Sequence, residues 1–162
     1  MKNSLVAYFS ATGTTKEVAE NLAEVTKSDT YEIKPAIPYT DADLNWTNRD
    51  SRTSIEMRDK HSRPEIIKDD FKLDKYDTIF LGFPIWWYVA PTIINTFLES
   101  HDFSGKTVIL FATSGGSGFG GTMEYLKSSV SKSTKLIEGK LLNFDPSIEE
   151  IKEWVDSLEV HA

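Results

Sequence analysis

Three runs of this sequence are apolar on both faces of an extended strand, and each is followed by apolar residues at helical spacing. They cover residues 5–9 (LVAYF), 78–83 (TIFLGF) and 107–113 (TVILFAT). Strands that are apolar on both faces suit a parallel sheet that helices cover on each side. Two weaker strands are expected at 29–34 and 136–143. The alternation of strands and helices therefore predicts an α/β sandwich with a parallel sheet and right-handed crossovers.

Four helices are predicted from apolar residues that recur every three or four positions. Pro91 suits the first turn of the second helix, because proline is favoured there, and residues 145–147 (DPS) suit the start of the last one. The apolar positions of the four helices are Val18, Leu22 and Val25; Ile93, Ile94, Phe97 and Leu98; Phe119, Met123, Leu126 and Val130; and Ile148, Ile151, Val155 and Leu158.

Residues 36–75 depart from this alternation. About 40 residues separate the second expected strand from the third, which is more than one crossover needs. The stretch is polar and contains Pro38 and Pro64. We interpret it as an irregular insertion with one or two helices, such as residues 63–71. Residues 1–162 are expected to form a single domain that carries this insertion.

The composition excludes several classes of function. The net charge is −7 and the pI is near 5.0, which argues against sequence-independent nucleic-acid binding because such binding needs clustered cations. The chain has no cysteine, so thiolate catalysis and cysteine-ligated metal sites are excluded. No apolar run reaches the roughly 18–20 residues of a membrane span, and the N-terminus lacks a signal-peptide pattern. We therefore expect a cytoplasmic protein with no metal, nucleic-acid or membrane partner.

Three turns that follow the strong strands carry the residues with the most chemical information. Residues 10–15 (SATGTT) are rich in hydroxyls, residues 84–91 (PIWWYVAP) contain large aromatic rings, and residues 114–121 (SGGSGFGG) are rich in glycine. In an open parallel sheet, ligands bind beyond the carboxyl ends of the strands, so these turns are expected to meet. A ligand with a phosphate at one end and a flat ring at the other would use all three.

The first turn has the features of an anion site. Ser10, Thr12, Thr14 and Thr15 place four hydroxyls around Gly13. They directly precede a helix whose first N–H groups lack partners within the helix and whose dipole is positive at this end. Taken alone, such a turn is also typical of a helix cap, a tryptophan pair is typical of a core, and a glycine run is typical of a flexible turn. Their joint occurrence at one edge favours a binding site.

Two competing phosphate motifs do not fit. No Gly-x-x-x-x-Gly-Lys-Ser/Thr string is present, and the dinucleotide fingerprint Gly-x-Gly-x-x-Gly is absent after the first strand. Residues 116–121 (GSGFGG) match the second spacing, but they follow the strand at 107–113 and not the first strand. Neither motif therefore accounts for the first turn.

The chain resembles the flavodoxin family. The phosphate loop of that family reads roughly Ser/Thr-x-Thr-Gly-x-Thr, and residues 10–15 match each defined position. Residues 82–87 (GFPIWW) and 113–118 (TSGGSG) look like a bacterial flavodoxin-like subgroup. The resemblance covers nearly the whole chain and implies a flavodoxin-like three-layer αβα sandwich, a five-stranded parallel sheet of order 2-1-3-4-5, and non-covalently bound FMN. The uncharged third turn departs from the acidic loop that the family's electron carriers often have, and the insertion at 36–75 is not typical of the smallest flavodoxins.

The resemblance also implies roles for the three turns. The hydroxyls and N–H groups of the first turn would hold the FMN phosphate, and one of Trp86, Trp87 or Tyr88 would stack on the isoalloxazine ring. Glycine N–H groups of the third turn would approach the pyrimidine edge of the ring. No catalytic residue or metal ligand is assigned, because the chemistry belongs to the flavin. The predicted cofactor-binding residues are Ser10, Ala11, Thr12, Gly13, Thr14, Thr15, Pro84, Ile85, Trp86, Trp87, Tyr88, Thr113, Ser114, Gly115, Gly116, Ser117 and Gly118.

The redox role stays open between two interpretations. One is an electron carrier that serves a redox partner protein. The other is an FMN-dependent oxidoreductase that takes hydride from NAD(P)H and reduces a small-molecule acceptor such as a quinone. The uncharged third turn and the arginines of the insertion lean toward the oxidoreductase.

Two flavin-free classes of function fit the sequence poorly. A phosphoacceptor signalling domain of similar topology would need an aspartate at the end of the third strand and acidic residues after the first, where this chain has Phe83 and Ser10. A flavin-free binding module would leave the meeting of the three turns unexplained. A flavin-dependent redox protein is therefore the function that the sequence favours.

Overall fold

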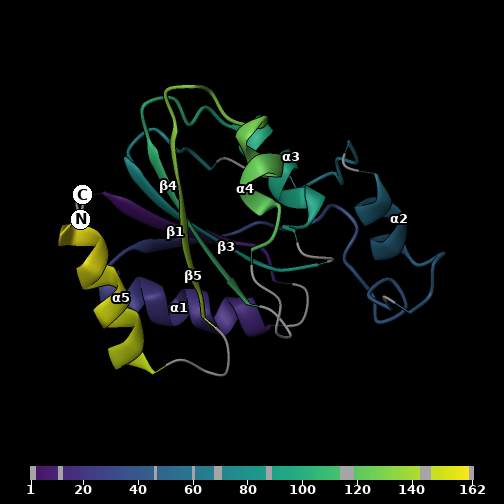
Figure 1. The fold of residues 1–162 in the computed structure, drawn as a ribbon, viewed down its shortest axis with the longest axis horizontal. Helices are drawn as coiled ribbons and strands as arrows, with labels where there is room; N and C mark the ends of the chain where they lie inside the picture. The colour runs from purple at the N-terminus through teal and green to yellow at the C-terminus, as the bar shows by residue number, and fades with distance from the viewer. Residues whose placement is uncertain are drawn as a thin grey trace.

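The chain alternates strands and helices around one parallel sheet. The computed structural model describes residues 3–10, 13–45, 47–59, 61–67, 71–86, 89–113, 119–142 and 147–160. In chain order the elements are β1 (Ser4–Tyr8), α1 (Thr14–Thr26), β2 (Asp29–Glu32), α2 (Arg52–Arg58), β3 (Thr78–Pro84), α3 (Thr92–Ser100), β4 (Thr107–Thr113), α4 (Thr122–Lys127), β5 (Lys135–Leu141) and α5 (Ile148–Val160). The sheet order is β2-β1-β3-β4-β5, and helices cover both of its faces (Figure 1). The expected fold class is confirmed.

Alternate residues of the central strands pack against helices on opposite faces. Val6 of β1 is in register with Phe80 of β3, which pairs with Ile109 of β4. These three side chains form one core cluster with residues of α1 and α5, including Leu22 and Ile151. The second cluster, on the side of α3 and the insertion, includes Leu5, Ala7, Phe9, Ile79, Leu81, Phe83, Ile93, Phe97 and Leu110. Burial on both faces explains why these strands read as unbroken apolar runs.

The fourth helix is shorter than its apolar pattern predicts. The pattern runs from Phe119 to Val130, whereas α4 covers Thr122–Lys127. The residues after α4 are rich in serine, and serine hydroxyls offer the backbone alternatives to helical hydrogen bonds. The Ser128 hydroxyl donates to the Tyr125 carbonyl at 3.2 Å, at the point where the helix ends.

The insertion contains a helix, but in a different place from the one predicted at 63–71. Residues 63–67 are extended, and Ile66 pairs with Pro35 in an antiparallel bridge. The Ala36 N–H donates to the Glu65 carbonyl and the Ile67 N–H to the Lys34 carbonyl, each at 2.8 Å. The predicted helix is therefore wrong at residues 63–67, because this segment pairs with a partner that is distant in sequence; residues 68–70 lie outside the described residues.

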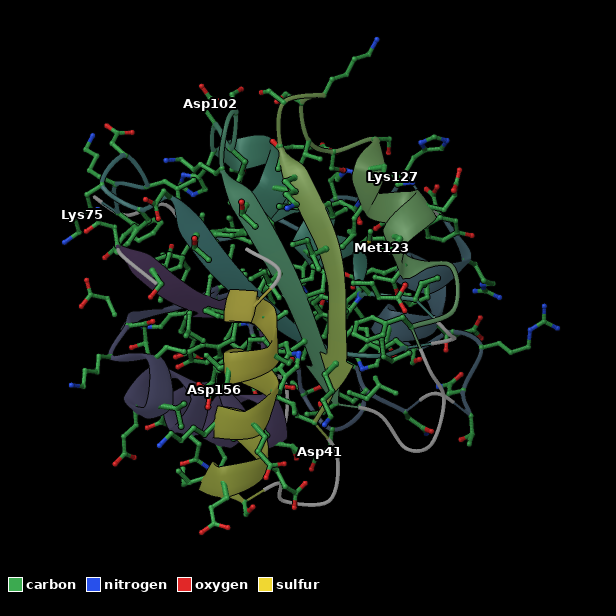
Figure 2. The ribbon with its side chains drawn as sticks, turned by 60° about the vertical axis from the view of Figure 1, so that its left-hand side comes forward. Asp41, Lys75, Asp102, Met123, Lys127 and Asp156 are labelled. Carbon is green, nitrogen blue, oxygen red and sulfur yellow. The ribbon has the colours of Figure 1, made fainter. Side chains whose placement is uncertain are left out.

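The observed helix of the insertion is α2. Its start is capped by Ser51, whose Oγ accepts the Ser54 N–H, an ordinary helix-capping arrangement. Figure 1 shows α2 beyond the end of the sheet toward which the strand arrows point. Figure 2 agrees, because Lys75 and Asp102 lie toward the end from which the strands start and Asp41 of the insertion lies toward the opposite end. The insertion therefore adds surface at the carboxyl edge of the sheet.

Within the described ranges, no helix combines the length and the apolar character needed to span a membrane.

Candidate functional site

The turn between β1 and α1 forms a compact hydroxyl-bearing corner. Gly13 has φ +97°, a left-handed conformation that residues with a Cβ rarely adopt. Its N–H donates to the Ser10 Oγ at 3.0 Å, and the Glu17 N–H donates to the Gly13 carbonyl at 3.1 Å. The Ser10 hydroxyl thus accepts one bond within the turn and keeps its own O–H free to donate outward. Ala11 and Thr12 lie outside the described residues.

Two of the predicted site residues meet across the molecule. The Thr15 and Thr113 hydroxyl oxygens are 2.9 Å apart and buried, and Thr15 is only 2% exposed. This bond ties the first turn of α1 to the end of β4. Thr15 therefore braces the site from inside, whereas Gly13 and Thr14 are exposed and Ser10 is half-buried.

The turn after β3 is fastened to the same place. Pro84 is in register with Thr113 at the ends of β3 and β4, and the Ile85 N–H donates to the Thr113 carbonyl at 2.8 Å. Trp86 and Val89 then exchange two backbone hydrogen bonds of 2.9 and 3.1 Å. These bonds hold Trp86 beside Val89, and the two residues between them in sequence, Trp87 and Tyr88, are outside the described residues.

Trp86 packs into the protein at this turn. Its ring meets Phe9 edge-to-face at 5.7 Å and Tyr39 edge-to-face at 5.6 Å, measured between centroids, and it packs against the core cluster below α3. Trp86 is therefore an anchor for the turn. The prediction that one of Trp86, Trp87 or Tyr88 stacks on a ligand ring stays a prediction, because Trp87 and Tyr88 lie outside the described residues.

The third turn begins and ends beside the other two. It starts at Thr113, which contacts the first and second turns as described. Residues 114–118 are outside the described part of the chain. Where the description resumes, Phe119 is buried, and Gly121 lies next to Val89 of the second turn, since a Cβ at Gly121 would be in ordinary van der Waals contact with the Val89 Cγ1 at 3.6 Å. The ends of all three turns thus converge at the carboxyl edge of the sheet.

Three residues of the insertion that the sequence did not single out complete this edge. The Arg52 guanidinium lies 3.8 Å above the Tyr39 ring. The Tyr39 hydroxyl donates to Glu56 Oε1 at 2.6 Å, and the Arg52 Nε donates to Glu56 Oε2 at 3.0 Å. Burial raises the pKa of the Tyr39 hydroxyl well above its usual value, and the hydrogen bond to Glu56 raises it further. Only the i,i+4 spacing of Arg52 and Glu56 could have been noticed in the sequence.

The chemistry of the converged turns suits an anionic, ring-bearing ligand. The exposed side of the first turn carries hydroxyls and the N-terminal end of a 13-residue helix, which together favour a phosphate without a formal positive charge. The second turn is predicted to add aromatic surface through Trp87 and Tyr88, which are outside the described residues. Among the described residues, no cluster of three or more His, Asp or Glu side chains could hold a metal ion. The described residues therefore fit a phosphorylated flavin.

The comparisons with known proteins agree with this site. A family model described as Flavodoxin matches residues 3–158. The chain is 49% identical to a protein described as a flavoprotein from Bacteroides uniformis, with 95% of this chain and 97% of that one covered and a TM-score of 0.89. It is 48% identical to a similarly described protein from Bacteroides eggerthii, with 97% and 98% covered and a TM-score of 0.89.

A third solved structure holds a bound cofactor. It is a flavoprotein from Lactobacillus acidophilus in complex with FMN, 26% identical to this chain, with 96% of this chain and 99% of that one covered and a TM-score of 0.68. The search among curated proteins found no match. Because the family model covers nearly the whole sequence and the sheet order is the one that the resemblance implied, the chain belongs to the flavodoxin family.

Proposed function

We propose that this chain binds FMN non-covalently at the carboxyl edge of its sheet and transfers electrons through it. Membership of the flavodoxin family and the FMN complex of the Lactobacillus acidophilus relative support FMN as the cofactor. The observation that carries the proposal is the meeting of the three turns at Thr113, through its hydroxyl bond to Thr15 and its carbonyl bond to Ile85.

The phosphate would lie against the first turn. Ser10 and Thr14 have hydroxyls within reach of solvent, and the N–H groups of the first helical turn point toward the same end of α1. Thr15 would support this corner through Thr113. Thr12, which is outside the described residues, stays a predicted ligand on its sequence position alone.

The isoalloxazine ring would lie against the second and third turns. Trp87 or Tyr88 would cover one face, because Trp86 is engaged with Phe9 and Tyr39. Residues 114–118 would supply N–H groups to the pyrimidine edge. A flavin held there would supply the one- and two-electron redox chemistry, while the protein's own residues bind the phosphate, orient the ring and exclude water from one face.

The finer redox role is part of the proposal. We assign first an electron carrier for a redox partner protein, which family membership supports. The second candidate is a reductase that uses NAD(P)H and a quinone-type acceptor, favoured by the insertion that adds α2 at the edge of the site. Anaerobic mixing of the FMN-loaded protein with NADPH distinguishes them. Rapid loss of flavin absorbance supports the reductase, and loss only with a chemical reductant supports the carrier. A cytoplasmic location also stays a prediction, testable by cell fractionation.

Cofactor retention tests the phosphate assignment. The double variant T12A/T14A should bind FMN at least about tenfold more weakly, because each lost charge-assisted hydrogen bond contributes about 1.5–3 kcal/mol. Thr47→Ala is a matched control, since Thr47 is an exposed threonine whose hydroxyl bonds to Asn45 in the insertion. Unchanged FMN affinity in the double variant would contradict the assignment.

A further inference from the structure

A chain of aromatic contacts connects the insertion to the second turn of the site. Trp86 meets Tyr39 with an interplanar angle of 72° and Phe9 with an angle of 87°, both edge-to-face. Tyr39 also meets Phe9 edge-to-face at 5.6 Å. The three rings therefore form a closed triangle, in which Phe9 lies at the end of β1 and Tyr39 comes from the insertion. Edge-to-face pairs of this kind are favourable beyond simple burial.

Tyr39 is held on its other side by a salt-bridged pair from α2. The Arg52 guanidinium lies over the Tyr39 ring at 3.8 Å, a cation–π contact. The Glu56 carboxylate uses one oxygen for the Tyr39 hydroxyl and the other for Arg52. The side chains of Arg52 and Glu56 are only 22% and 14% exposed, so these charges are partly shielded from solvent screening.

Arg52 is in turn fixed from several directions. Its Nη1 donates to the Ile37 carbonyl at 2.6 Å and lies 3.9 Å from Asp43 Oδ2. The same Asp43 oxygen accepts the Thr40 N–H at 3.0 Å. The guanidinium therefore has little freedom to leave the face of the Tyr39 ring, and the ring has little freedom to leave Trp86.

Trp86 is the last described residue before Trp87 and Tyr88, the residues proposed to stack on the flavin. Trp86 forms both of the backbone hydrogen bonds that close the turn with Val89, and residues 87 and 88 follow it directly in sequence. The packing of its indole on Phe9 and Tyr39 therefore fixes the described start of the turn that is proposed to carry the stacking residue.

We propose that Tyr39, clamped by Arg52 and Glu56, is a positioning residue that sets the orientation of Trp86 and so the aromatic wall of the cofactor site. The inference rests on the proposed FMN site. It gives the insertion a defined role, which is to hold the second turn, residues 84–91, in position through Tyr39.

The test compares two changes at Tyr39. Tyr39→Leu removes the ring and should weaken FMN binding about fivefold to tenfold, because the aromatic pairs with Phe9 and Trp86 and the cation–π contact with Arg52 are all lost. Tyr39→Phe keeps the ring and loses only the hydroxyl, so it should restore most of the affinity. Arg52→Met should fall between these two.

Arg58→Met is the matched control. Arg58 belongs to α2, as Arg52 does. Its Nη2 donates to the Arg49 carbonyl at 2.7 Å, so its side chain is engaged in the insertion without touching Tyr39. It should leave FMN affinity within about twofold of the unmodified chain. A loss equal to that of Tyr39→Leu would overturn the proposal, because the effect would then be general loosening of α2.

A second readout does not depend on FMN. Fluorotryptophan labelling gives each indole its own fluorine signal, and Trp86→Phe identifies the signal of Trp86. In the FMN-free protein, Tyr39→Leu should shift or broaden that signal and leave unmoved the signal of Trp154, which belongs to α5 and meets Phe80 in the other core cluster. A Trp86 signal that is unchanged in Tyr39→Leu would overturn the proposal even if the variant binds FMN weakly. If the unmodified chain does not bind FMN, the proposed function fails, while the fluorine signals still decide the role of Tyr39.

Discussion

The hydroxyl oxygens of Thr15 and Thr113 lie 2.9 Å apart in the interior, although 98 residues separate them in sequence. Thr15 begins the buried face of α1 and Thr113 ends β4. The bond joins two of the three turns that form the candidate FMN site, and the third is joined through the Thr113 carbonyl. The site is thus built around one buried polar contact.

Removing either hydroxyl of this pair should destabilise the protein. Thr15→Val or Thr113→Val leaves the other hydroxyl buried without its partner, which costs about 1–3 kcal/mol of unfolding free energy. The double variant should lose less than the sum of the two single losses, because no orphaned hydroxyl remains. Urea unfolding of the four proteins measures this. Strictly additive losses would show that the two hydroxyls do not interact.

Gly13 should be needed for both stability and cofactor affinity. Gly13→Ala forces a Cβ into φ +97°, which costs about 1–2 kcal/mol, and it shifts the hydroxyl corner that precedes α1. Gly105→Ala is the control, because Gly105 has φ +74° and equally open surroundings but lies in the turn before β4, at the other end of the sheet. It should lose similar stability in urea and keep its FMN affinity. An equal loss of FMN affinity in both variants would count against a local role of Gly13.

Thr92 should be replaceable with a gain in stability. It is 4% exposed at the start of α3, and its hydroxyl finds no hydrogen-bond partner in the described part of the chain. Thr92→Val removes a buried unsatisfied group and should raise the unfolding free energy by about 1 kcal/mol. Thr122→Val is the opposite case, because the buried Thr122 hydroxyl donates to the Phe119 carbonyl at 2.5 Å. The melting temperature of Thr92→Val should lie above that of the unmodified chain, and the melting temperature of Thr122→Val should lie below it.

The Tyr39 hydroxyl should make stability depend on alkaline pH. Burial, and then the hydrogen bond to Glu56, raises its pKa in the folded state above the unfolded value, which is about 10. Its contribution is therefore complete below about pH 10 and declines as the pH rises from there, by up to about 1.4 kcal/mol per pH unit. The difference in unfolding free energy between the unmodified chain and Tyr39→Phe should shrink over that range. A difference that stays constant with pH would contradict this account.

The centre of the fold could be predicted because its signals are local. Residues 107–113 are apolar throughout, and β4 covers those residues. The hydroxyl-rich turn before α1 could also be recognised, because residue types in a short window encode both the helix start and the anion chemistry. The fourth helix is shorter than predicted and ends at Lys127, because the serines that follow compete for backbone hydrogen bonds.

The insertion could not be predicted in the same way. The extended segment at 63–67 is held by Lys34 and Ala36, and no local pattern reveals a partner that distant. Tyr39 and Arg52 gain their role only when the insertion folds back on Trp86. Sequence patterns identify the turns that carry the chemistry, whereas the residues that hold those turns in place are found from tertiary contacts.

Titration of the FMN-free protein with FMN and with riboflavin tests the central claim most directly. The two ligands share the ring and differ in the phosphate, which is the group assigned to the turn at Ser10, Gly13 and Thr14. Flavin fluorescence should show saturable binding of FMN at one site per chain and at least about tenfold weaker binding of riboflavin. Folded protein that binds neither ligand, or binds both equally well, would contradict the account.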